Sequence, residues 1–421
     1  MFIEHGMFMN HVKSFSLPLS LLTAPTIALT AALSVFFTAA VFAATEVEIS
    51  AASVISQEES ILDLDQFRSG EAIYADSSHP EALDKDVTWE RGDSVAPLFS
   101  PAYLNGGTYL EGWDFVFDFD DGTIISAQIV VSNFGSGNHR MLVLVKLTEP
   151  SGREVTLKNG RGRSDWFKHE GEFDYQIAQH HFWKDGDTFY FRFSHPSGDI
   201  NLVAESITKP LNLGVVWSGA KAGYQYVNIF APRMMVSGQY RIKDEDSGIL
   251  QAYQTLGHGV GHGLRHITSS AIGEAFRAWL RAFASGSSSN NELSPIIDMR
   301  QLKNGRTKVN VRLLDAKGSV IDDLSFETES SLLEDSRADC CSVIALNAAG
   351  NGNLDGTISL DKQVQQFDVV DELKPFERFF VRMFKTPIST RFRLSYDLTY
   401  TENGTSVHLI GQGLADLMTL K

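Results

Sequence analysis

Residues 113–131, WDFVFDFDDGTIISAQIVV, decide the fold class of this chain. Aromatic side chains fill every second position from 113 to 119, which is the period of a β-strand with one apolar face. The pair Asp121-Gly122 favours a tight hairpin, and the apolar alternation resumes at Ile125. The stretch therefore predicts an antiparallel hairpin.

The same alternation returns in both halves of the chain. It is found at 141–147, 188–193, 309–313 and 392–400. Asn403-Gly404 follows the last of these stretches and is a strong hairpin signal. Helical patterns are few. Outside the centre of the chain, the one that best fits a helix is 365–384, which is interrupted by Pro375. We therefore expect a mainly β fold of two β-meander halves that close as barrels or pack as a sandwich.

Composition and charge place the chain among globular proteins and narrow its partners. With 36 Lys and Arg against 52 Asp and Glu, the formal net charge is −16. Nucleic acids and anionic membrane surfaces need concentrated basic faces, so we expect no nucleic acid as a partner. Phenylalanine is abundant, with 28 residues against 6 Trp and 11 Tyr, which indicates broad apolar surfaces that form a core or line a cavity.

The N-terminal region has the features of an export signal. Lys13 precedes a long apolar stretch, 15–44, that closes with small residues. Cleavage after Ala43 would remove a signal peptide at 1–43, whereas an uncleaved stretch would associate with the membrane as an anchor. Both alternatives place the bulk of the protein outside the cytoplasm, in the periplasm or secreted.

Composition divides the remainder into three parts. Residues 44–97 are acidic and rich in Ser, Ala and Asp, as expected of a linker or N-terminal arm. Residues 98–248 and 249–421 are the two expected β domains.

The two cysteines, Cys340 and Cys341, are adjacent, which excludes a disulfide framework. They are then either two small residues of a strand or the partners of a strained vicinal disulfide.

The centre of the chain, 253–284, has the sequence least typical of scaffold. His258, His262 and His266 recur every four residues, with glycines at every second position of 257–263. Each interior glycine costs a helix about 1 kcal/mol relative to alanine, which disfavours a helix. In a strand, successive rings would stand about 13 Å apart, too far for one metal ion. We therefore expect no metal site and no cofactor, and assign the histidines to polar contacts or to a ligand.

Several stretches resemble known proteins. Residues 113–135, WDFVFDFDDGTIISAQIVVSNFG, and 162–202, GRSDWFKHEGEFDYQIAQHHFWKDGDTFYFRFSHPSGDINL, carry the resemblance, which continues through GHGVGHGLRH at 257–266 to Gly411-Gln412-Gly413. They resemble the group of lipocalin-like proteins in the calycin superfamily that includes AttH, the fungal survival factors and carotenoid 1,2-hydratase. The motifs are diffuse and cover the chain from Trp113 to its end.

The resemblance implies two tandem lipocalin-like antiparallel β-barrels with few helices and a cavity for a lipid, isoprenoid or similar apolar molecule. Carriers, a hydratase and cyclases share this scaffold, so the fold does not decide the function. Where the group has an Asp-His acid pair, this chain has His262 and Gly263. An enzyme would therefore use His262 or His266 as its proton donor, with no paired group nearby in the sequence.

The resemblance also implies a strand over 277–284. The residues permit this strand, but Ile272, Phe276 and Trp279 also fall on one face of a helix with Ser270 as its N-cap. We favour the strand, which would place Trp279 against the ligand or between the two domains.

We expect an exported binding or carrier protein for a hydrophobic ligand, a lipid or isoprenoid-like small molecule. The first alternative is a hydratase, isomerase or cyclase acting on a terpenoid or polyketide-like substrate. The second is a carbohydrate-binding β-sandwich in which Trp113, Trp166 and Trp183 form an exposed platform. The residues expected to act are the catalytic candidates His262 and His266 and the ligand-binding candidates His258, Arg265, Trp279, Trp113 and Trp166.

Overall fold

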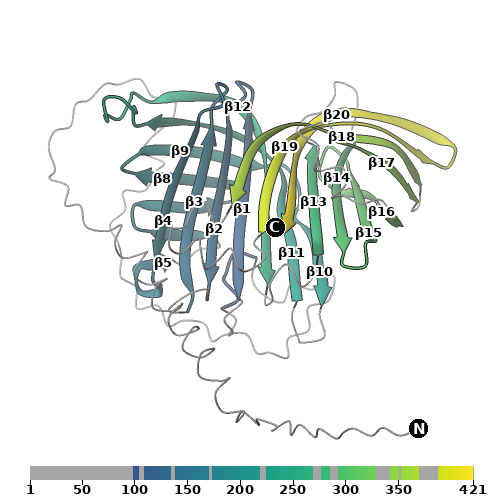
Figure 1. Ribbon diagram of the computed structural model, residues 1–421, viewed down its shortest axis with the longest axis horizontal. Coiled ribbons are helices and arrows are strands. Elements are labelled where there is room, and N and C mark those ends of the chain that lie inside the picture. Colours follow the sequence, from purple (N-terminus) through teal and green to yellow (C-terminus); the bar gives the residue numbers. More distant parts are fainter. Residues whose placement is uncertain are drawn as a thin grey trace, which may run out of the picture. The chain divides into compact units, whose positions relative to one another are not determined.

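The structure, a computed structural model, consists of β-strands in two antiparallel sheets (Figure 1). It describes residues 98–103, 109–133, 138–169, 173–218, 224–268, 276–284, 293–328, 342–349, 352–368 and 387–420. Within these ranges, helix is limited to the 3-10 turn η3 (Arg163–Asp165). None of the helical structure in the described ranges is long and apolar enough to cross a membrane.

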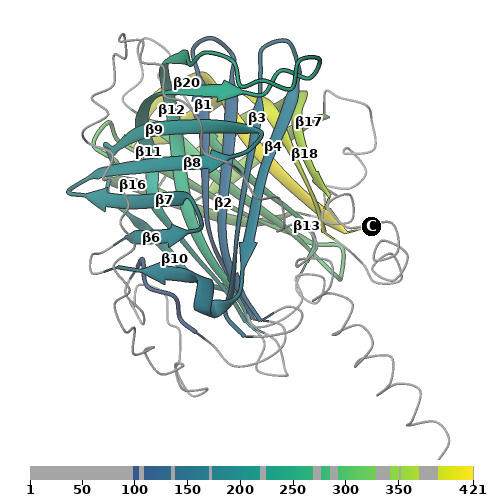
Figure 2. The same ribbon diagram turned by 90° about the vertical axis from the view of Figure 1, so that its left-hand side faces the viewer.

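The first sheet has twelve strands. They are β1 (Leu110–Phe119), β2 (Ile124–Ser132), β3 (Arg140–Thr148), β4 (Glu154–Arg161), β5 (Trp166–Lys168), β6 (Asp174–Ile177), β7 (His180–Asp185), β8 (Thr188–His195), β9 (Gly198–Ser206), β10 (Leu211–Ser218), β11 (Tyr224–Ile242) and β12 (Gln254–Thr268). The strand order is β4-β3-β2-β1-β12-β11-β9-β8-β7-β6-β5, and β10 pairs with β11. Figure 1 shows β1 to β4 side by side, and Figure 2 shows β6 to β9 in succession.

The second sheet has eight strands. They are β13 (Phe276–Ala284), β14 (Ser294–Leu302), β15 (Thr307–Leu314), β16 (Val320–Thr328), β17 (Ser342–Ala349), β18 (Asn353–Asp368), β19 (Pro387–Glu402) and β20 (Thr405–Leu420). The order is β16-β15-β14-β13-β20-β19-β18-β17, and the edge strands β16 and β17 approach each other. The long strands β18, β19 and β20 curve together (Figure 1). The predicted fold class is confirmed, because both antiparallel sheets curl toward closure.

Each sheet has its own core. The first-sheet core is aromatic, with Phe115 and Phe117 of β1 packed against Phe191 of β8. The second-sheet core is mainly aliphatic. A third cluster lies between outward faces of the two sheets, where Leu264 of β12 packs with Phe283 of β13.

The predicted hairpins are confirmed. Asp121-Gly122 joins β1 to β2, with a φ of 89° at Gly122. Asn403-Gly404 joins β19 to β20, with φ of 50° and 78°. Asn403 and Gly404 have the left-handed conformations that a two-residue hairpin turn requires, and Gly122 is the left-handed residue of a three-residue loop. The strand predicted over 277–284 is also confirmed, as β13.

Long-range pairing overrides two expectations. The helix predicted at 365–384 is wrong as far as Asp368, because these residues pair with β19, and its remainder lies outside the described residues. The predicted division at 248/249 precedes β12, yet β12 pairs with β1 and β11, so the change of sheet comes after Thr268. The expected parts 1–43 and 44–97 and both cysteines also lie outside the described residues.

Candidate ligand-binding site

The histidine and glycine repeat forms strand β12, inside the first sheet. Its glycines are registered with the phenylalanines of β1: Gly259 with Phe119, Gly261 with Phe117 and Gly263 with Phe115. A Cβ added at Gly263 would lie 2.3 Å from a ring carbon of Phe230, which also belongs to the aromatic core. The glycines thus let aromatic rings lie against the β12 backbone. On this face of β12 the repeat is therefore a packing feature of the first sheet.

The segment 98–103 precedes β1 and enters the interior of the first sheet. Phe99 belongs to its aromatic core and is 2% exposed. The Phe99 ring centroid lies 5.1 Å from that of Phe230, 5.3 Å from that of Phe173 and 5.8 Å from that of Phe189. A side chain from outside the strands therefore fills part of this interior.

Three consecutive carbonyls of the segment accept hydrogen bonds from the sheet. Trp113 Nε1 donates to Leu98 O at 3.3 Å, Tyr175 Oη to Phe99 O at 2.5 Å and Arg265 Nη2 to Ser100 O at 2.9 Å. Each donor side chain is buried. A buried donor left without a partner would cost about 1–3 kcal/mol, so these carbonyls stabilise the interior as well as the segment.

An ion pair lies beside these donors. Arg265 of β12 contacts Glu111 Oε1 of β1 through Nε at 2.7 Å and Nη2 at 2.6 Å, and both residues are buried. Tyr109 Oη donates to Glu111 Oε2 at 2.6 Å, and the backbone N of Ala102 donates to the same oxygen at 2.7 Å. Burial and the adjacent carboxylate raise the pKa of Tyr109 well above its ordinary value. The buried pair is thus surrounded by hydrogen bonds, as its desolvation requires.

Tyr103 lies at the end of the segment. Its φ of 49° is left-handed, a conformation that costs a bulky residue roughly 1–2 kcal/mol. The Tyr103 ring stacks on Trp166 with centroids 6.4 Å apart, and the Arg163 guanidinium lies 4.2 Å from the Trp166 ring centroid. Trp166 Nε1 donates to His139 O at 2.9 Å. Ring packing therefore holds the strained end of the segment in place.

Three of the predicted ligand-binding residues come together here. Arg265 lies over the Trp113 ring at 5.7 Å, and the Tyr175 ring centroid is 5.4 Å from Trp113 and 6.3 Å from Trp166. The tryptophans are buried among core side chains, and Trp183 is 4% exposed beneath stacked His181 and Tyr190. The exposed carbohydrate platform is therefore wrong.

His262 lies on the face of β12 opposite to Arg265. It is 5% exposed, and its ring stacks on Phe283 of β13 with centroids 3.7 Å apart. Burial, with a contribution from nearby Arg391, lowers the pKa of His262 to about 3. Its Nε2 has no hydrogen-bond partner among the described residues. A neutral imidazole near pH 7 is a poor proton donor, so the geometry does not suit His262 as a general acid.

His266 lies beside the carboxylate of Asp114, a residue that is distant from it in the sequence. Its Nδ1 lies 3.1 Å from Asp114 Oδ2 of β1, and both side chains are partly exposed. Gly112, registered with His266, leaves room for the ring: a Cβ there would lie 2.5 Å from its Cε1. His258 is exposed and joins neither histidine in a site.

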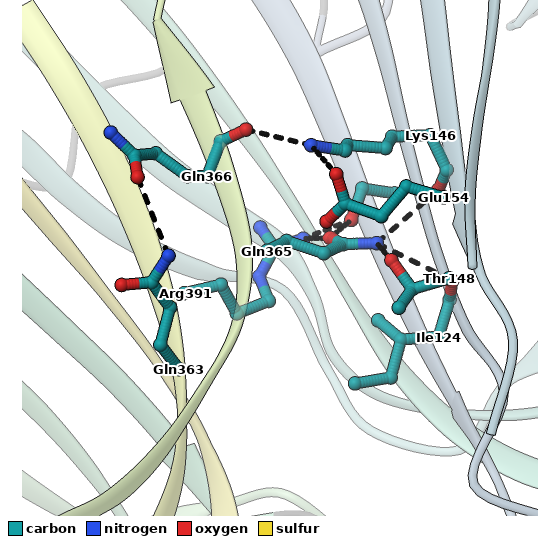
Figure 3. Close-up of polar contacts among 9 residues, drawn as sticks. Ile124, Lys146, Thr148, Glu154, Gln363, Gln365, Gln366 and Arg391 are labelled. Atoms are coloured by element: carbon teal, nitrogen blue, oxygen red, sulfur yellow. Dashed lines mark hydrogen bonds and ion pairs between the residues drawn. The ribbon is translucent and has the colours of Figure 1, made fainter. Parts of the chain in front are cut away.

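Polar side chains connect the outward faces of the two sheets. Figure 3 shows Gln365 of β18 donating to Thr148 Oγ1 of β3 at 2.9 Å and Lys146 Nζ donating to Gln366 O at 2.8 Å. Ser126 hydrogen-bonds to Gln365 and Arg391. The contact is therefore largely hydrogen-bonded and fixes which strands face each other.

A buried ion pair anchors this contact. Arg391 of β19 binds Asp416 of β20 through Nε–Oδ1 at 2.6 Å and Nη2–Oδ2 at 3.1 Å. Burial alone would raise the pKa of Asp416, but the guanidinium outweighs it and holds the pKa below its ordinary value.

Trp279 of β13 lies in the cluster between the sheets and donates from Nε1 to Asp298 Oδ2 at 3.1 Å. A cavity of about 10 Å³ nearby is lined by residues that include Arg233, Phe283 and Leu314. That volume holds about one water molecule. Trp279 therefore has a packing role, and this cavity does not accommodate a lipid.

Sequence reasoning missed Glu111, Tyr109 and Tyr175. The sequence does contain one sign of Glu111: it lies two residues before Trp113, at a position of β1 whose side chain points to the same inward face as Trp113 and Phe115. A carboxylate in phase with an aromatic face requires a buried partner. The sequence does not indicate which basic residue supplies it, since Arg265 comes from the other end of the first sheet's sequence.

The similarities of this chain to known proteins are to solved structures at low sequence identity. No protein-family model and no curated protein matches the chain. A solved structure of CghA is similar, with a TM-score of 0.49 at 13% identity over 82% of this chain and 96% of CghA. CghA solved with Sch210972 has a TM-score of 0.48 at 11% identity, over 79% and 95% of the two chains. A Nitrosomonas europaea protein assigned to AttH has a TM-score of 0.41 at 12% identity, over 77% and 98%. The last of these carries the name of a member of the group that the sequence resembles.

Proposed function

We propose that the chain is a binding or carrier protein for a hydrophobic small molecule held inside the first sheet. The observation that carries the proposal is Phe99, an apolar side chain from outside the strands that lies among the interior rings of Phe173, Phe189 and Phe230. Concave aromatic interiors with a few converging polar groups are the usual form of small-molecule sites. Here the polar groups are those of Glu111 and Arg265.

Native mass spectrometry tests this function. Protein purified from its own host, and protein incubated with geranylgeraniol or methyl palmitate, should retain an apolar molecule at a one-to-one ratio. Ala127→Leu enlarges a buried side chain of the first-sheet core and should reduce retention, whereas Ile249→Ala removes a side chain that is 69% exposed and should not. Failure to retain any apolar species would rule out the proposal.

A second candidate is an acid–base enzyme, a hydratase, isomerase or cyclase for a terpenoid or polyketide-like substrate. The Asp114–His266 contact at 3.1 Å favours it, because a carboxylate orients an imidazole for proton transfer. Under this proposal His266→Gln lowers turnover of an added terpenoid by at least about 100-fold, and the exposed control His258→Gln leaves it unchanged. Equal turnover of His266→Gln and the unsubstituted protein would remove the assignment.

Export belongs to the leading proposal and is supported by the apolar stretch 15–44 with its small-residue end. N-terminal sequencing of the protein recovered from the periplasm or medium should start at Ala44. An intact N-terminus in the membrane fraction would instead indicate an anchor.

A further inference from the structure

Three buried side chains of the first sheet donate hydrogen bonds to the segment 98–103. Trp113, Tyr175 and Arg265 each donate to one of three successive carbonyls, those of residues 98, 99 and 100. The Phe99 ring packs on Phe230 within the aromatic core, with ring centroids 5.1 Å apart. The segment 98–103 thus has the form of a bound molecule: an aromatic group with carbonyl oxygens on one side.

We propose that this site recognises a neutral apolar molecule carrying at least two carbonyl oxygens, such as an amide, and that segment 98–103 occupies the site until such a molecule displaces it. The inference rests on the proposed binding function and adds the ligand's polar chemistry and an internal competitor. The competitor explains how a site with a packed interior can admit a ligand.

The segment is held by contacts that another molecule could reproduce. It belongs to neither sheet. Its contacts include the three carbonyls, the amide of Ala102 on Glu111, the amide of Tyr103 on Tyr109 Oη at 3.3 Å and the packing of its side chains. The left-handed φ of 49° at Tyr103 adds strain that leaving the site would relieve. An occupant with the same groups and no such strain would compete well.

The charges of the site favour a neutral carbonyl over an anion. Arg265 is already paired with Glu111 at 2.6 Å, and both side chains are buried. A second carboxylate near Arg265 would meet the charge of Glu111 at low dielectric. The other two donors, an indole and a phenol, are neutral and suit carbonyl oxygens.

Isothermal titration calorimetry with three matched probes tests the inference. N-acetyl-L-phenylalanine amide has a phenyl ring and two carbonyls, propylbenzene has the ring alone, and 3-phenylpropionate has the ring with a carboxylate. Each is titrated into the full chain and into Phe99→Ala, which weakens the internal competitor by removing a buried ring. Phe99→Leu replaces it if Phe99→Ala does not fold.

We expect Phe99→Ala to bind the amide tenfold or more tightly than the unsubstituted chain, and more tightly than the other two probes. Adding Tyr175→Phe should weaken amide binding about three- to tenfold, because the hydroxyl that meets the Phe99 carbonyl is lost. Propylbenzene binding should not change. Tyr190→Phe is the control, since that ring stacks on Trp183 away from the site.

The outcomes separate the two proposals. Equal binding of amide and propylbenzene would overturn the carbonyl preference and leave apolar binding standing. Equal affinity of Phe99→Ala and the unsubstituted chain for the amide would overturn the competition by segment 98–103. A folded Phe99→Ala protein that binds no probe would overturn this inference, and if it also retains no lipid, the proposed function fails with it.

Discussion

Replacing Gly263 by alanine is the sharpest test of why β12 carries alternating glycines. The new methyl group would lie 2.3 Å from Cε2 and 2.5 Å from Cζ of Phe230. The ring cannot withdraw easily, because its centroid is 5.1 Å from that of Phe99 and 5.2 Å from that of Phe115. Either the aromatic core or the β12 backbone must shift.

The expected loss of stability follows from two opposing terms. Overpacking a well-filled core costs about 1–3 kcal/mol. Replacing glycine by alanine also restricts the unfolded chain, which returns about 0.4–1 kcal/mol. For Gly263→Ala we expect a net decrease of about 1–2 kcal/mol in the free energy of unfolding. Gly257→Ala, on the same strand, meets nothing within 4 Å and should be neutral or slightly stabilising.

Urea denaturation followed by circular dichroism compares the two variants. The free energy of unfolding of Gly263→Ala should lie about 2 kcal/mol below that of Gly257→Ala. If the free energies of unfolding of the two variants agreed within about 0.5 kcal/mol, the aromatic core would have space for the added methyl group. The packing explanation of the glycine repeat would then be refuted.

Three further predictions concern buried charge. Arg265→Met leaves the Glu111 carboxylate buried without its cation and should lower the free energy of unfolding by about 3–5 kcal/mol. The double variant Arg265→Met with Glu111→Leu should lower it by less than Arg265→Met alone; a double-mutant cycle in urea measures this, and additive losses would contradict it. The pKa of His262 is lowered to about 3, so the stability that depends on its neutral ring is complete above about pH 6.5 and is lost as the pH falls toward 3. His262→Leu should reduce the slope of the free energy of unfolding against pH, measured in urea between pH 6 and 4, by up to about 1.4 kcal/mol per pH unit; an unchanged slope would argue against burial of the ring. Asp416→Asn leaves Arg391 without its carboxylate and should lower the melting temperature measured by calorimetry. The decrease should be far larger than for the control Asp397→Asn, which changes an exposed carboxylate that contacts His408; equal decreases would mean that the Arg391–Asp416 pair is solvated.

Local sequence signals predicted the strands because their physical causes are local. Alternation of apolar side chains and the Asp-Gly and Asn-Gly turns depend on neighbouring residues, and β1, β2, β19 and β20 formed where they indicated. The order of the strands depends on pairing between distant residues. Nothing near Gly263 in the sequence indicates that it faces Phe230 or that β12 lies beside β1.

The candidate site was predicted in part for the same reason. Arg265, Trp113 and Trp166 were selected and lie together in the first sheet. Glu111 was missed, since its role appears only when the strands meet. The partner of His266 also comes from β1, so the sequence near the histidine could not reveal it.

The position of β12 has a consequence for synthesis of the chain. The strand is central in the first sheet yet is made last among its members, after β1 through β11. Until residue 268 leaves the ribosome, β1 and β11 each keep an unpaired edge, and β1 carries three phenylalanines. Such edges are sites at which nascent chains associate with one another or with chaperones. A fragment meant to fold as the first sheet must therefore extend through Thr268, and one ending at 248 would leave that gap open.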